Sequence, residues 1–260
     1  MWPDGMRCAV AFTFDFDTEE VFLADDPTSA DRPGLLSQGT YGAKVGVPLI
    51  LELLERHAIK GTFFVPGRSA ERHRDRVRQI VAAGHELAHH GYTHISPTAL
   101  SREQEREELT EGLRVLQSFG AEVVGYRSPA WEFSAHTMEL LVEHGFRYSS
   151  NFMDDLVPYR HPGSGLVELP VQWILDDAAH FWFEGSTWTK AIATGGTVRE
   201  IWEGEFRGYH ALGGAFVLTM HPQVIGRPYR LEMLDEFITA VKGYGDVWIA
   251  TCREIAERVP

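Results

Sequence analysis

Short apolar runs alternate with longer segments of helical periodicity along most of the chain. The first run, CAVAFTF over residues 8–14, is rich in β-formers and predicts a buried strand. An amphipathic helical segment over 45–57 follows it, and then a second apolar run over 62–65. Further strands are predicted over residues 86–88, 123–126, 147–150, 166–171, 215–220 and 246–249, and further helices over 69–83, 101–119, 134–144, 197–211, 230–243 and 253–257.

This alternation, without a Pro- or Ser-rich linker, predicts one α/β domain over residues 1–260 with a largely parallel sheet. The chain length favours a closed or nearly closed (β/α) barrel over an open sheet, because barrels of roughly 250 residues are common single domains. Residues 151–164 and 181–188 are predicted to form long loops, which tend to be functional in compact α/β domains.

Composition and charge argue against several kinds of partner. The 24 Lys and Arg residues against 37 Asp and Glu give a net charge of −13, so neither nucleic acid nor an anionic membrane is an expected partner. No apolar stretch reaches the ~20 residues of a membrane span, and no signal-peptide pattern is visible. We therefore expect a cytoplasmic protein. Cys8 and Cys252 are expected to be reduced, buried thiols, although they flank strands that would be neighbours in a closed barrel.

Polar side chains follow four of the predicted strands. In a parallel barrel these positions open onto one end, where active sites lie. Carboxylates, imidazoles and a guanidinium are hard to explain as packing at such positions. The residues concerned are Asp15 and Asp17 after the first strand, His90 and His94 after the third, Arg127 after the fourth, and His221 after the strand over 215–220.

The first two of these segments have the composition of a metal site. Asp15 and Asp17 stand two residues apart, which in a strand places both carboxylates on one face. His90 and His94 are four apart on a turn and can hold one ion, although a hydrogen-bonded surface pair is the alternative. Two imidazoles with the Asp17 carboxylate make a three-ligand site that leaves positions open for water and substrate. That is the composition of a catalytic metal centre.

The remaining candidates have both a catalytic and a structural interpretation. Arg127 carries a planar guanidinium suited to holding the Asp15 carboxylate, or it forms a surface ion pair. His221 is placed to face the metal and to donate a proton to a leaving group, or it is a structural histidine. Trp131 either forms a wall of the substrate pocket or lies in the core.

Residues 85–89, HELAH, spell the motif of zinc proteases. That chemistry needs both histidines on one face of an intact helix, whereas Gly84 and Gly91 flank the segment and a strand is predicted over 86–88. We therefore expect His85 and His89 to be structural, with His89 also able to line the site.

Four segments together resemble the ordered motifs of the polysaccharide deacetylases, the NodB-homology group of carbohydrate esterase family 4. They are TFDFD (13–17), HGYTH (90–94), RSPAW (127–131) and LTMHP (218–222), and with their spacing the resemblance covers residues 8–222. It implies a distorted (β/α) barrel, often of seven strands, and one divalent metal ion, with zinc expected first and cobalt, nickel or iron as alternatives. The resemblance implies Asp17, His90 and His94 as metal ligands, Asp15 as catalytic base, Arg127 as the residue that tethers this base, and His221 as general acid.

The chain departs from the extracellular sugar deacetylases at two points. Phe16 separates aspartates that are usually adjacent there, and the aspartate that positions the acid histidine is not clearly present, with Asp176 and Asp177 as candidates. The segments GTYG (39–42) and LPVQW (169–173) are more similar to a leaderless branch that includes peptidoglycan deacetylases, allantoinase-like enzymes and cyclic-imide hydrolases, and that tends to form homo-oligomers. Tyr41, Trp131 and Trp173 are expected to contact substrate.

The expected activity is therefore metal-dependent hydrolysis of a non-peptide C–N amide bond, with an N-acetylated sugar as the default substrate. Ring opening of a cyclic amide by the same centre is the alternative enzyme, and a metal-free carbohydrate-binding homologue is the alternative outside enzymes. Aromatic residues over 181–188 are expected to stack on a sugar, to seal a small pocket or to form an oligomer interface; they are Phe181, Trp182, Phe183 and Trp188.

Overall fold

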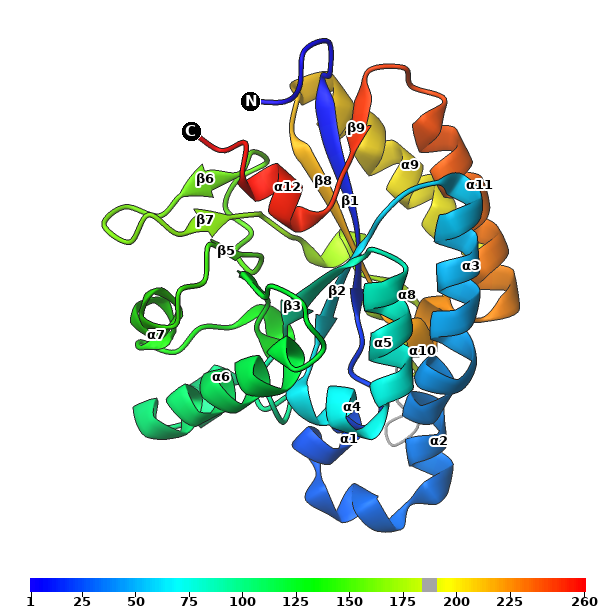
Figure 1. The fold of residues 1–260 in the computed structure, drawn as a ribbon. Coiled ribbons are helices and arrows are strands. Elements are labelled where there is room, and N and C mark those ends of the chain that lie inside the picture. Colours follow the sequence, from blue (N-terminus) through cyan, green and yellow to red (C-terminus); the bar gives the residue numbers. More distant parts are fainter. Residues whose placement is uncertain (184–190) are drawn as a thin grey trace.

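In the computed structural model, which describes residues 1–183 and 191–260, one curled sheet forms a distorted and incompletely closed barrel (Figure 1). Its strand order is β6-β7-β5-β4-β3-β2-β1-β8, and β9 also pairs with β1. Neighbouring strands are parallel except for β6 and β7. The nine strands of the described residues are β1 (Cys8–Asp15), β2 (Thr62–Val65), β3 (Glu86–His89), β4 (Gly125–Tyr126), β5 (Tyr148–Ser149), β6 (Tyr159–Arg160), β7 (Val167–Glu168), β8 (Ala215–Met220) and β9 (Val247–Ile249).

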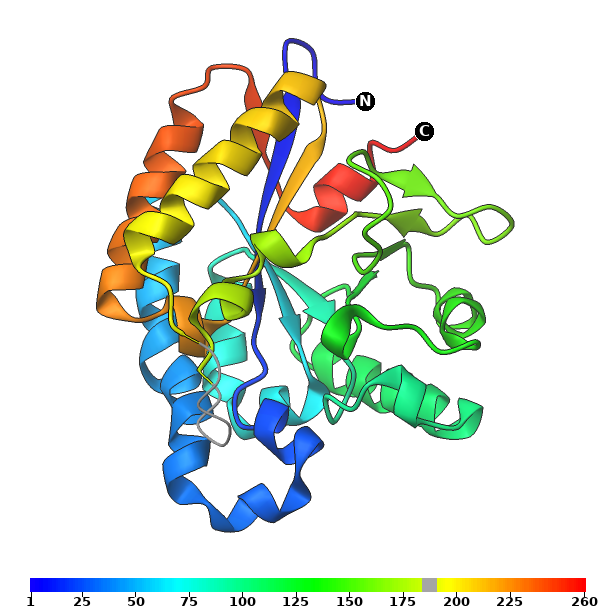
Figure 2. The same cartoon turned by 180° about the vertical axis from the view of Figure 1, so that it is seen from behind.

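Helices cover the outer face of this sheet, with α3, α9 and α11 side by side along β1 and β8 (Figures 1 and 2). Both termini lie at the end of the barrel where β1 begins (Figure 1). The helices are α1 (Glu20–Asp25), α2 (Pro33–Tyr41), α3 (Val47–His57), α4 (Gly67–Arg72), α5 (Arg74–Ala82), α6 (Arg102–Gln117), α7 (Thr137–Glu143), α8 (Asp177–Phe181), α9 (Gly195–Leu212), α10 (Pro222–Ile225), α11 (Pro228–Lys242) and α12 (Cys252–Ala256).

The central strand β1 is buried on both faces, and its alternation separates two cores. Phe12 and Phe14 belong to the large apolar cluster between the sheet and its helices. Ala9 and Ala11 point the other way, into the barrel interior, where small side chains leave room for larger ones from neighbouring strands. The interior face of β1 becomes polar towards its carboxyl end, at Thr13 and Asp15. The polar side chains of β1 that face the barrel interior therefore lie at one end of the barrel.

The opening of the barrel is narrowed where two distant parts of the chain meet. The segment after β7 returns to β8 at one isolated parallel bridge, between Asp176 and Thr219. This bridge brings the start of α8 next to the carboxyl end of β8, the strand that leads into His221.

The predicted distorted α/β barrel is confirmed, with local differences. The strand count exceeds seven partly because β6 lies within the predicted loop 151–164. The helix predicted over 69–83 is interrupted at His73, whose Nε2 lies 2.8 Å from Glu19 Oε2. The sequence pattern did not predict helices α1, α2, α8 and α10. A five-residue π-helical turn (Gly42–Gly46) joins α2 to α3, so the predicted helix over 45–57 continues an earlier one.

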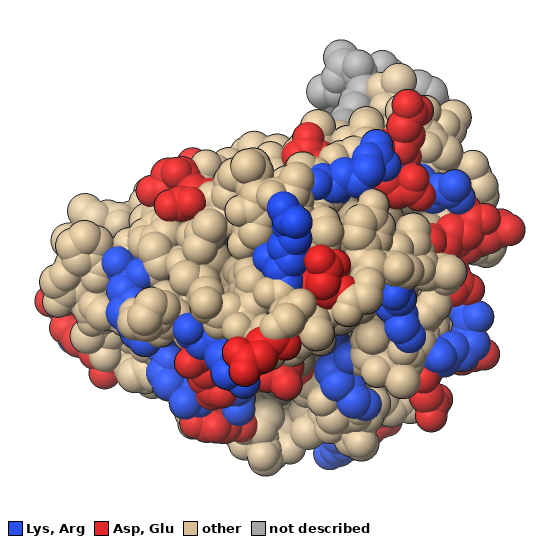
Figure 3. All heavy atoms as spheres, turned by 90° about the horizontal axis from the view of Figure 1, so that it is seen from above, with Lys and Arg blue, Asp and Glu red and all other residues tan. Residues whose placement is uncertain are grey.

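The remaining whole-chain expectations concern thiols, membrane spans and charge. Cys8 and Cys252 are both buried and free, and they belong to different core clusters. Within the described residues, no helix is long and apolar enough to cross a bilayer. On the face at the terminal end of the barrel, basic and acidic side chains are interspersed among other residues in the coloured part of the surface (Figure 3). That face offers no extended basic area of the kind that binds a phosphate backbone.

Candidate active site

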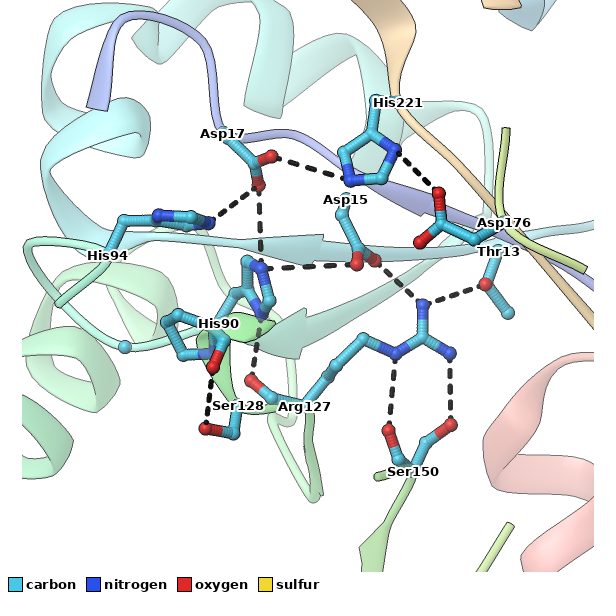
Figure 4. A network of polar contacts seen from close by, with 12 residues as sticks. Thr13, Asp15, Asp17, His90, His94, Arg127, Ser128, Ser150, Asp176 and His221 are labelled. Carbon is cyan, nitrogen blue, oxygen red and sulfur yellow. Dashed lines mark hydrogen bonds and ion pairs between the residues drawn. The ribbon is translucent and has the colours of Figure 1, made fainter. Parts of the chain in front are cut away.

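Six predicted site residues converge at the carboxyl ends of the strands (Figure 4). Asp15 ends β1 and Asp17 follows it, while His90 and His94 lie in the loop after β3. The other two, Arg127 and His221, directly follow β4 and β8. Because parallel strands deliver their carboxyl ends to one rim, residues more than 200 positions apart meet around one pocket.

Asp17, His90 and His94 form a cluster with the geometry of a cation site. Asp17 Oδ1 lies 3.5 Å from His90 Nε2 and 3.6 Å from His94 Nε2. One ligand atom from each of the three residues lies within 4.8 Å of the others. Asp17 Oδ1 is buried and has no hydrogen-bond partner within the described part of the chain. A buried carboxylate oxygen without a donor is costly unless something positive faces it, so this donor set fits a divalent cation.

The protonation of the two imidazoles suits metal binding. His90 Nδ1 lies 2.8 Å from the Arg127 carbonyl oxygen, which can only accept, so Nδ1 carries the proton and Nε2 keeps a free lone pair towards Asp17. Burial lowers the pKa of His90, against the opposing effect of Asp15 and Asp17. Burial, together with the positive charge of His221, lowers the pKa of His94 to about 4. Both rings are therefore neutral at pH 7, the form that binds metals.

Asp15 is held by a fully buried arginine inside the barrel. Arg127 Nη1 donates to Asp15 Oδ1 at 2.7 Å and to Thr13 Oγ1 at 2.9 Å, and Nη2 donates to Ser150 Oγ at 2.9 Å. The guanidinium also lies over the Phe64 ring, 4.1 Å from its centroid. Burial would raise the pKa of Asp15, but Arg127, through its charge and its hydrogen bond, lowers the pKa together with His90 and His221, and the net shift is downward. Asp15 is thus an oriented, ionised carboxylate beside the cation site.

His221 faces the same cluster from the opposite side. Its Nε2 lies 3.7 Å from Asp17 Oδ2. Its Nδ1 donates to Asp177 Oδ1 at 2.7 Å, and its backbone N–H donates to the same carboxylate at 3.0 Å. Burial would lower the pKa of His221, but Asp176 and Asp177 raise it well above its ordinary value. His221 is therefore a cationic proton donor whose Nε2 points into the pocket.

The sequence offers both Asp176 and Asp177 as the partner of His221, and in the structure Asp177 occupies that position. Asp176 Oδ1 is 3.9 Å from His221 Nδ1, and its side chain accepts the Ala178 backbone N–H as the N-cap of α8. Burial raises the pKa of Asp176 to about 6. These two carboxylates and His221 also form a compact donor group, but Nδ1 of His221 is occupied by the Asp177 hydrogen bond. The two carboxylates therefore fix the orientation of the His221 ring.

A pocket of about 490 Å³ contains the metal-site residues and three tryptophans. Trp131 and Trp173 line it with their ring centroids 4.5 Å apart, and Trp173 remains about half exposed at the rim. Trp182 forms another part of the wall and packs on Phe22. An aromatic surface next to the reacting centre suits a flat or sugar-like substrate.

Other predicted substrate and aromatic residues lie elsewhere. The Tyr41 hydroxyl donates to the Gly226 carbonyl oxygen at 2.9 Å, its ring lies under the Arg227 guanidinium, and it lines a separate cavity with Arg72. Phe181 is buried in the outer core. Trp188 lies outside the described residues.

The last four residues of the HELAH segment form strand β3 and His85 directly precedes it, so the segment is not a helix. His85 Nδ1 accepts the Gly61 backbone N–H at 3.1 Å. His89 is fully buried beneath α6, where Nε2 donates to the Leu109 carbonyl oxygen at 3.2 Å. In an extended backbone, residues four apart share a face but lie roughly 13 Å apart, at about 3.3 Å per residue, so the two histidines cannot hold one zinc ion as they would on successive turns of a helix.

The curled sheet and the pocket at its carboxyl rim place the chain among the distorted α/β barrels. The family description "Polysaccharide deacetylase" matches residues 39–149. A peptidoglycan deacetylase of Helicobacter pylori (strain ATCC 700392 / 26695) is 31% identical over 278 residues, which cover 95% of this chain and 94% of the relative. The chain belongs to the polysaccharide deacetylase family. Deacetylases are hydrolases of C–N bonds, and the family places the chain in that class.

Solved structures extend this similarity to the whole fold. A Mycobacterium smegmatis protein assigned to the polysaccharide deacetylases is 47% identical with a TM-score of 0.96, covering 100% of this chain and 92% of that one. An allantoinase is 27% identical with a TM-score of 0.87, covering 98% of this chain and 91% of the other. One barrel is therefore shared by relatives named for two kinds of amide substrate.

Proposed function

We propose that this protein is a metal-dependent hydrolase that removes the N-acetyl group from an N-acetylated sugar or a related amide. The observation that carries the proposal is the meeting of three groups of side chains in one pocket: a cation-binding cluster with an orphaned carboxylate oxygen, an arginine-held carboxylate, and a carboxylate-held histidine. Each chemical role that amide hydrolysis requires has a residue at that pocket.

Asp17, His90 and His94 would hold one divalent cation, with zinc first and cobalt, nickel or iron as alternatives. When bound, such an ion polarises the scissile carbonyl and lowers the pKa of the attacking water from ~15.7 towards ~7. The neutral imidazoles of His90 and His94 support this assignment, because they bind a metal without a prior change in protonation.

The reaction then depends on two proton transfers by groups on opposite sides of the pocket. Asp15 takes the proton of the attacking water. Arg127 keeps the Asp15 carboxylate ionised and oriented for this step. His221 gives its Nε2 proton to the departing nitrogen, and Asp177 fixes its tautomer through Nδ1. The lowered pKa of Asp15 and the raised pKa of His221 give a base and an acid that coexist near neutral pH.

The substrate proposal rests on the relatives and on the aromatic wall. The Helicobacter relative is named as a peptidoglycan deacetylase, and Trp131 and Trp173 offer faces on which a sugar ring can stack. Ring opening of a cyclic amide is the second candidate, because an allantoinase matches 98% of the chain at 27% identity. The same acid, base and cation site serve either bond. A metal-free binding homologue is disfavoured, because no catalytic role lacks a residue.

We further propose that the protein acts in the cytoplasm as a homo-oligomer. Support comes from the GTYG and LPVQW segments, which are similar to the leaderless branch. Size-exclusion chromatography with light scattering tests the oligomeric state, and a single monomer peak across a range of protein concentrations contradicts it.

A substrate panel tests the activity. Protein loaded in turn with zinc, cobalt and nickel is incubated with N-acetylglucosamine oligomers, peptidoglycan fragments, allantoin and a cyclic imide. Released acetate and ring-opened acids are both measured, and Asp15→Asn serves as the inactive control. Acetate release from a glycan supports deacetylation, and acid release from a ring supports the second candidate. Turnover that persists in Asp15→Asn contradicts the assigned base, and no turnover of any substrate with any metal contradicts the function.

A further inference from the structure

The loop that carries His94 adopts a backbone that L-residues rarely take. His94 has φ +63° and Gly91 has φ +75°, so both residues lie in the left-handed region. Glycine accommodates this conformation, but histidine does so at a cost that surrounding contacts must offset. The loop also leaves the sheet after His89, where β3 ends, so its backbone N–H groups need partners outside the ladder.

Glu108 of α6 supplies these partners. Its Oε2 accepts the backbone N–H groups of Tyr92 and Thr93, each at 2.7 Å. Its Oε1 accepts the Thr93 hydroxyl at 2.7 Å. Three short hydrogen bonds to one ionised acceptor are of the strong, charge-assisted kind, and they hold the two residues directly before His94.

The opposite side of the loop is fixed by a second helix. The backbone N–H groups of Gly67 and Arg68, at the start of α4, donate to the carbonyl oxygens of Gly91 and Tyr92 at 3.1 and 2.9 Å. The loop thus lies between α4 and the Glu108 carboxylate, with its carbonyl groups bonded on one side and its N–H groups on the other.

Helix α6 packs close enough to β3 for the Glu108 carboxylate to reach the 90–94 loop. His89 Nε2 donates to the Leu109 carbonyl oxygen, directly beside Glu108. A Cβ at Gly112 would lie 2.2 Å from His89 Nε2, so only glycine allows α6 to approach this closely. The His89 side chain, which the metal site does not use, therefore helps to set the position of the helix.

We propose that Glu108 is the positioning residue of the metal site: it holds the 90–94 loop in the strained conformation that aims His94 Nε2 at Asp17. This inference rests on the proposed function, since it assigns the purpose of the loop geometry to cation binding. Without the carboxylate, two N–H groups and one hydroxyl lose their acceptor, the left-handed backbone at His94 relaxes, and the third ligand moves away from the other two. The carboxyl group acts only through His94.

Three variants and two readouts test this proposal. Glu108→Ala removes all three bonds, whereas Glu108→Gln keeps an oxygen for the N–H groups and an amide that can pair with the Thr93 hydroxyl. Glu107→Ala is the matched control, because Glu107 is the neighbouring, exposed glutamate of the same helix. The readouts are the zinc Kd, from titration against a chromophoric chelator, and the amide hydrogen-exchange rates of Tyr92 and Thr93 in metal-free protein.

We expect Glu108→Ala to weaken zinc binding by about 10–100-fold, as removal of outer-sphere partners does in other metal sites. It should also speed exchange at both amides. Glu108→Gln should recover most of the affinity, and Glu107→Ala should leave Kd and exchange unchanged. If Glu108→Ala does not fold, Thr93→Val removes one of the three bonds and should weaken zinc binding by a smaller factor.

Two results would overturn the inference. The first is that Glu108→Ala binds zinc with the same Kd as Glu107→Ala. If Glu108→Ala does not fold, the same comparison is made with Thr93→Val. The other is faster exchange at the two amides with an unchanged Kd, which would make Glu108 a structural residue of the loop alone. If the wild-type protein binds no zinc, the proposed metal centre is contradicted, and with it the role assigned to Glu108. This outcome differs from the other two because it is seen before any substitution is made.

Discussion

The buried Asp15–Arg127 pair allows the sharpest prediction about stability. Arg127→Met keeps most of the side-chain length but leaves the Asp15 carboxylate inside the barrel without its counter-charge, and it removes donors from Thr13 and Ser150. Breaking a buried pair by removing one partner costs about 3–5 kcal/mol. For a chain of 260 residues, each kcal/mol corresponds to roughly 2–4 °C in Tm, so the loss is roughly 6–20 °C.

An exposed ion pair of equal length provides the control. Arg106 Nη2 lies 2.7 Å from Glu143 Oε2, as Arg127 Nη1 does from Asp15 Oδ1, but both members of that pair are about two-fifths exposed. Arg106→Met should therefore cost only about 0–1 kcal/mol. Urea unfolding and thermal melts are run in chelator, because a bound cation would stabilise the folded state separately.

The double variant Asp15→Asn with Arg127→Met isolates the uncompensated charge. It should be more stable than Arg127→Met alone, since the unpaired carboxylate is replaced by a neutral amide. Equal losses of stability in Arg127→Met and Arg106→Met would refute the reasoning, and so would a double variant that is no more stable than Arg127→Met alone.

Three further predictions concern other parts of the chain. Asp177→Asn should leave the zinc Kd unchanged while kcat falls by about 10²–10⁴-fold, and unchanged kcat would contradict its role as the partner of His221. Burial, with a smaller effect from Lys60, lowers the pKa of His85 from 6.5 to about 4, so the unfolded chain binds a proton that the folded protein excludes. Stability should therefore fall as pH decreases from 6.5 to 4, and His85→Asn should make this dependence shallower in urea titrations; an identical slope would contradict it. Burial raises the pKa of both Cys8 and Cys252 to about 12, so neither thiol should react with Ellman's reagent until the protein unfolds, and rapid native labelling would contradict their burial.

The position of the site could be predicted because it follows strand ends. Asp15 lies at the end of a strand, and His90, Arg127 and His221 each directly follow one; a parallel barrel brings all such positions to one rim. The spacing of the aspartates, two apart, also identified which carboxylates share a face. These inferences need only local pattern and fold class, and both are visible in the chain.

Features that depend on tertiary contacts could not be predicted. Asp177 meets His221 because the segment after β7 returns to β8 at the Asp176–Thr219 bridge, a pairing that no local pattern encodes. Tyr41 falls within a segment similar to relatives, yet its hydroxyl bonds to Gly226 away from the pocket.

Local patterns also did not reveal the break in one predicted helix or the contacts of Glu108 on which its proposed role rests. The helix predicted over 69–83 breaks at His73, where an imidazole bonds to the distant Glu19. Glu108 resembles the exposed Glu107 beside it in the sequence, and only the packing of α6 on the 90–94 loop distinguishes them.

Metal stoichiometry tests the central claim most directly. Wild-type protein, Asp177→Asn and His94→Ala are dialysed against zinc, and the bound metal is measured by elemental analysis. We predict one zinc ion per chain in the wild type and in Asp177→Asn, because Asp17, His90 and His94 remain intact, and a large loss in His94→Ala. Wild-type protein without zinc, or full occupancy in His94→Ala, would contradict the assignment of these three side chains as one cation site.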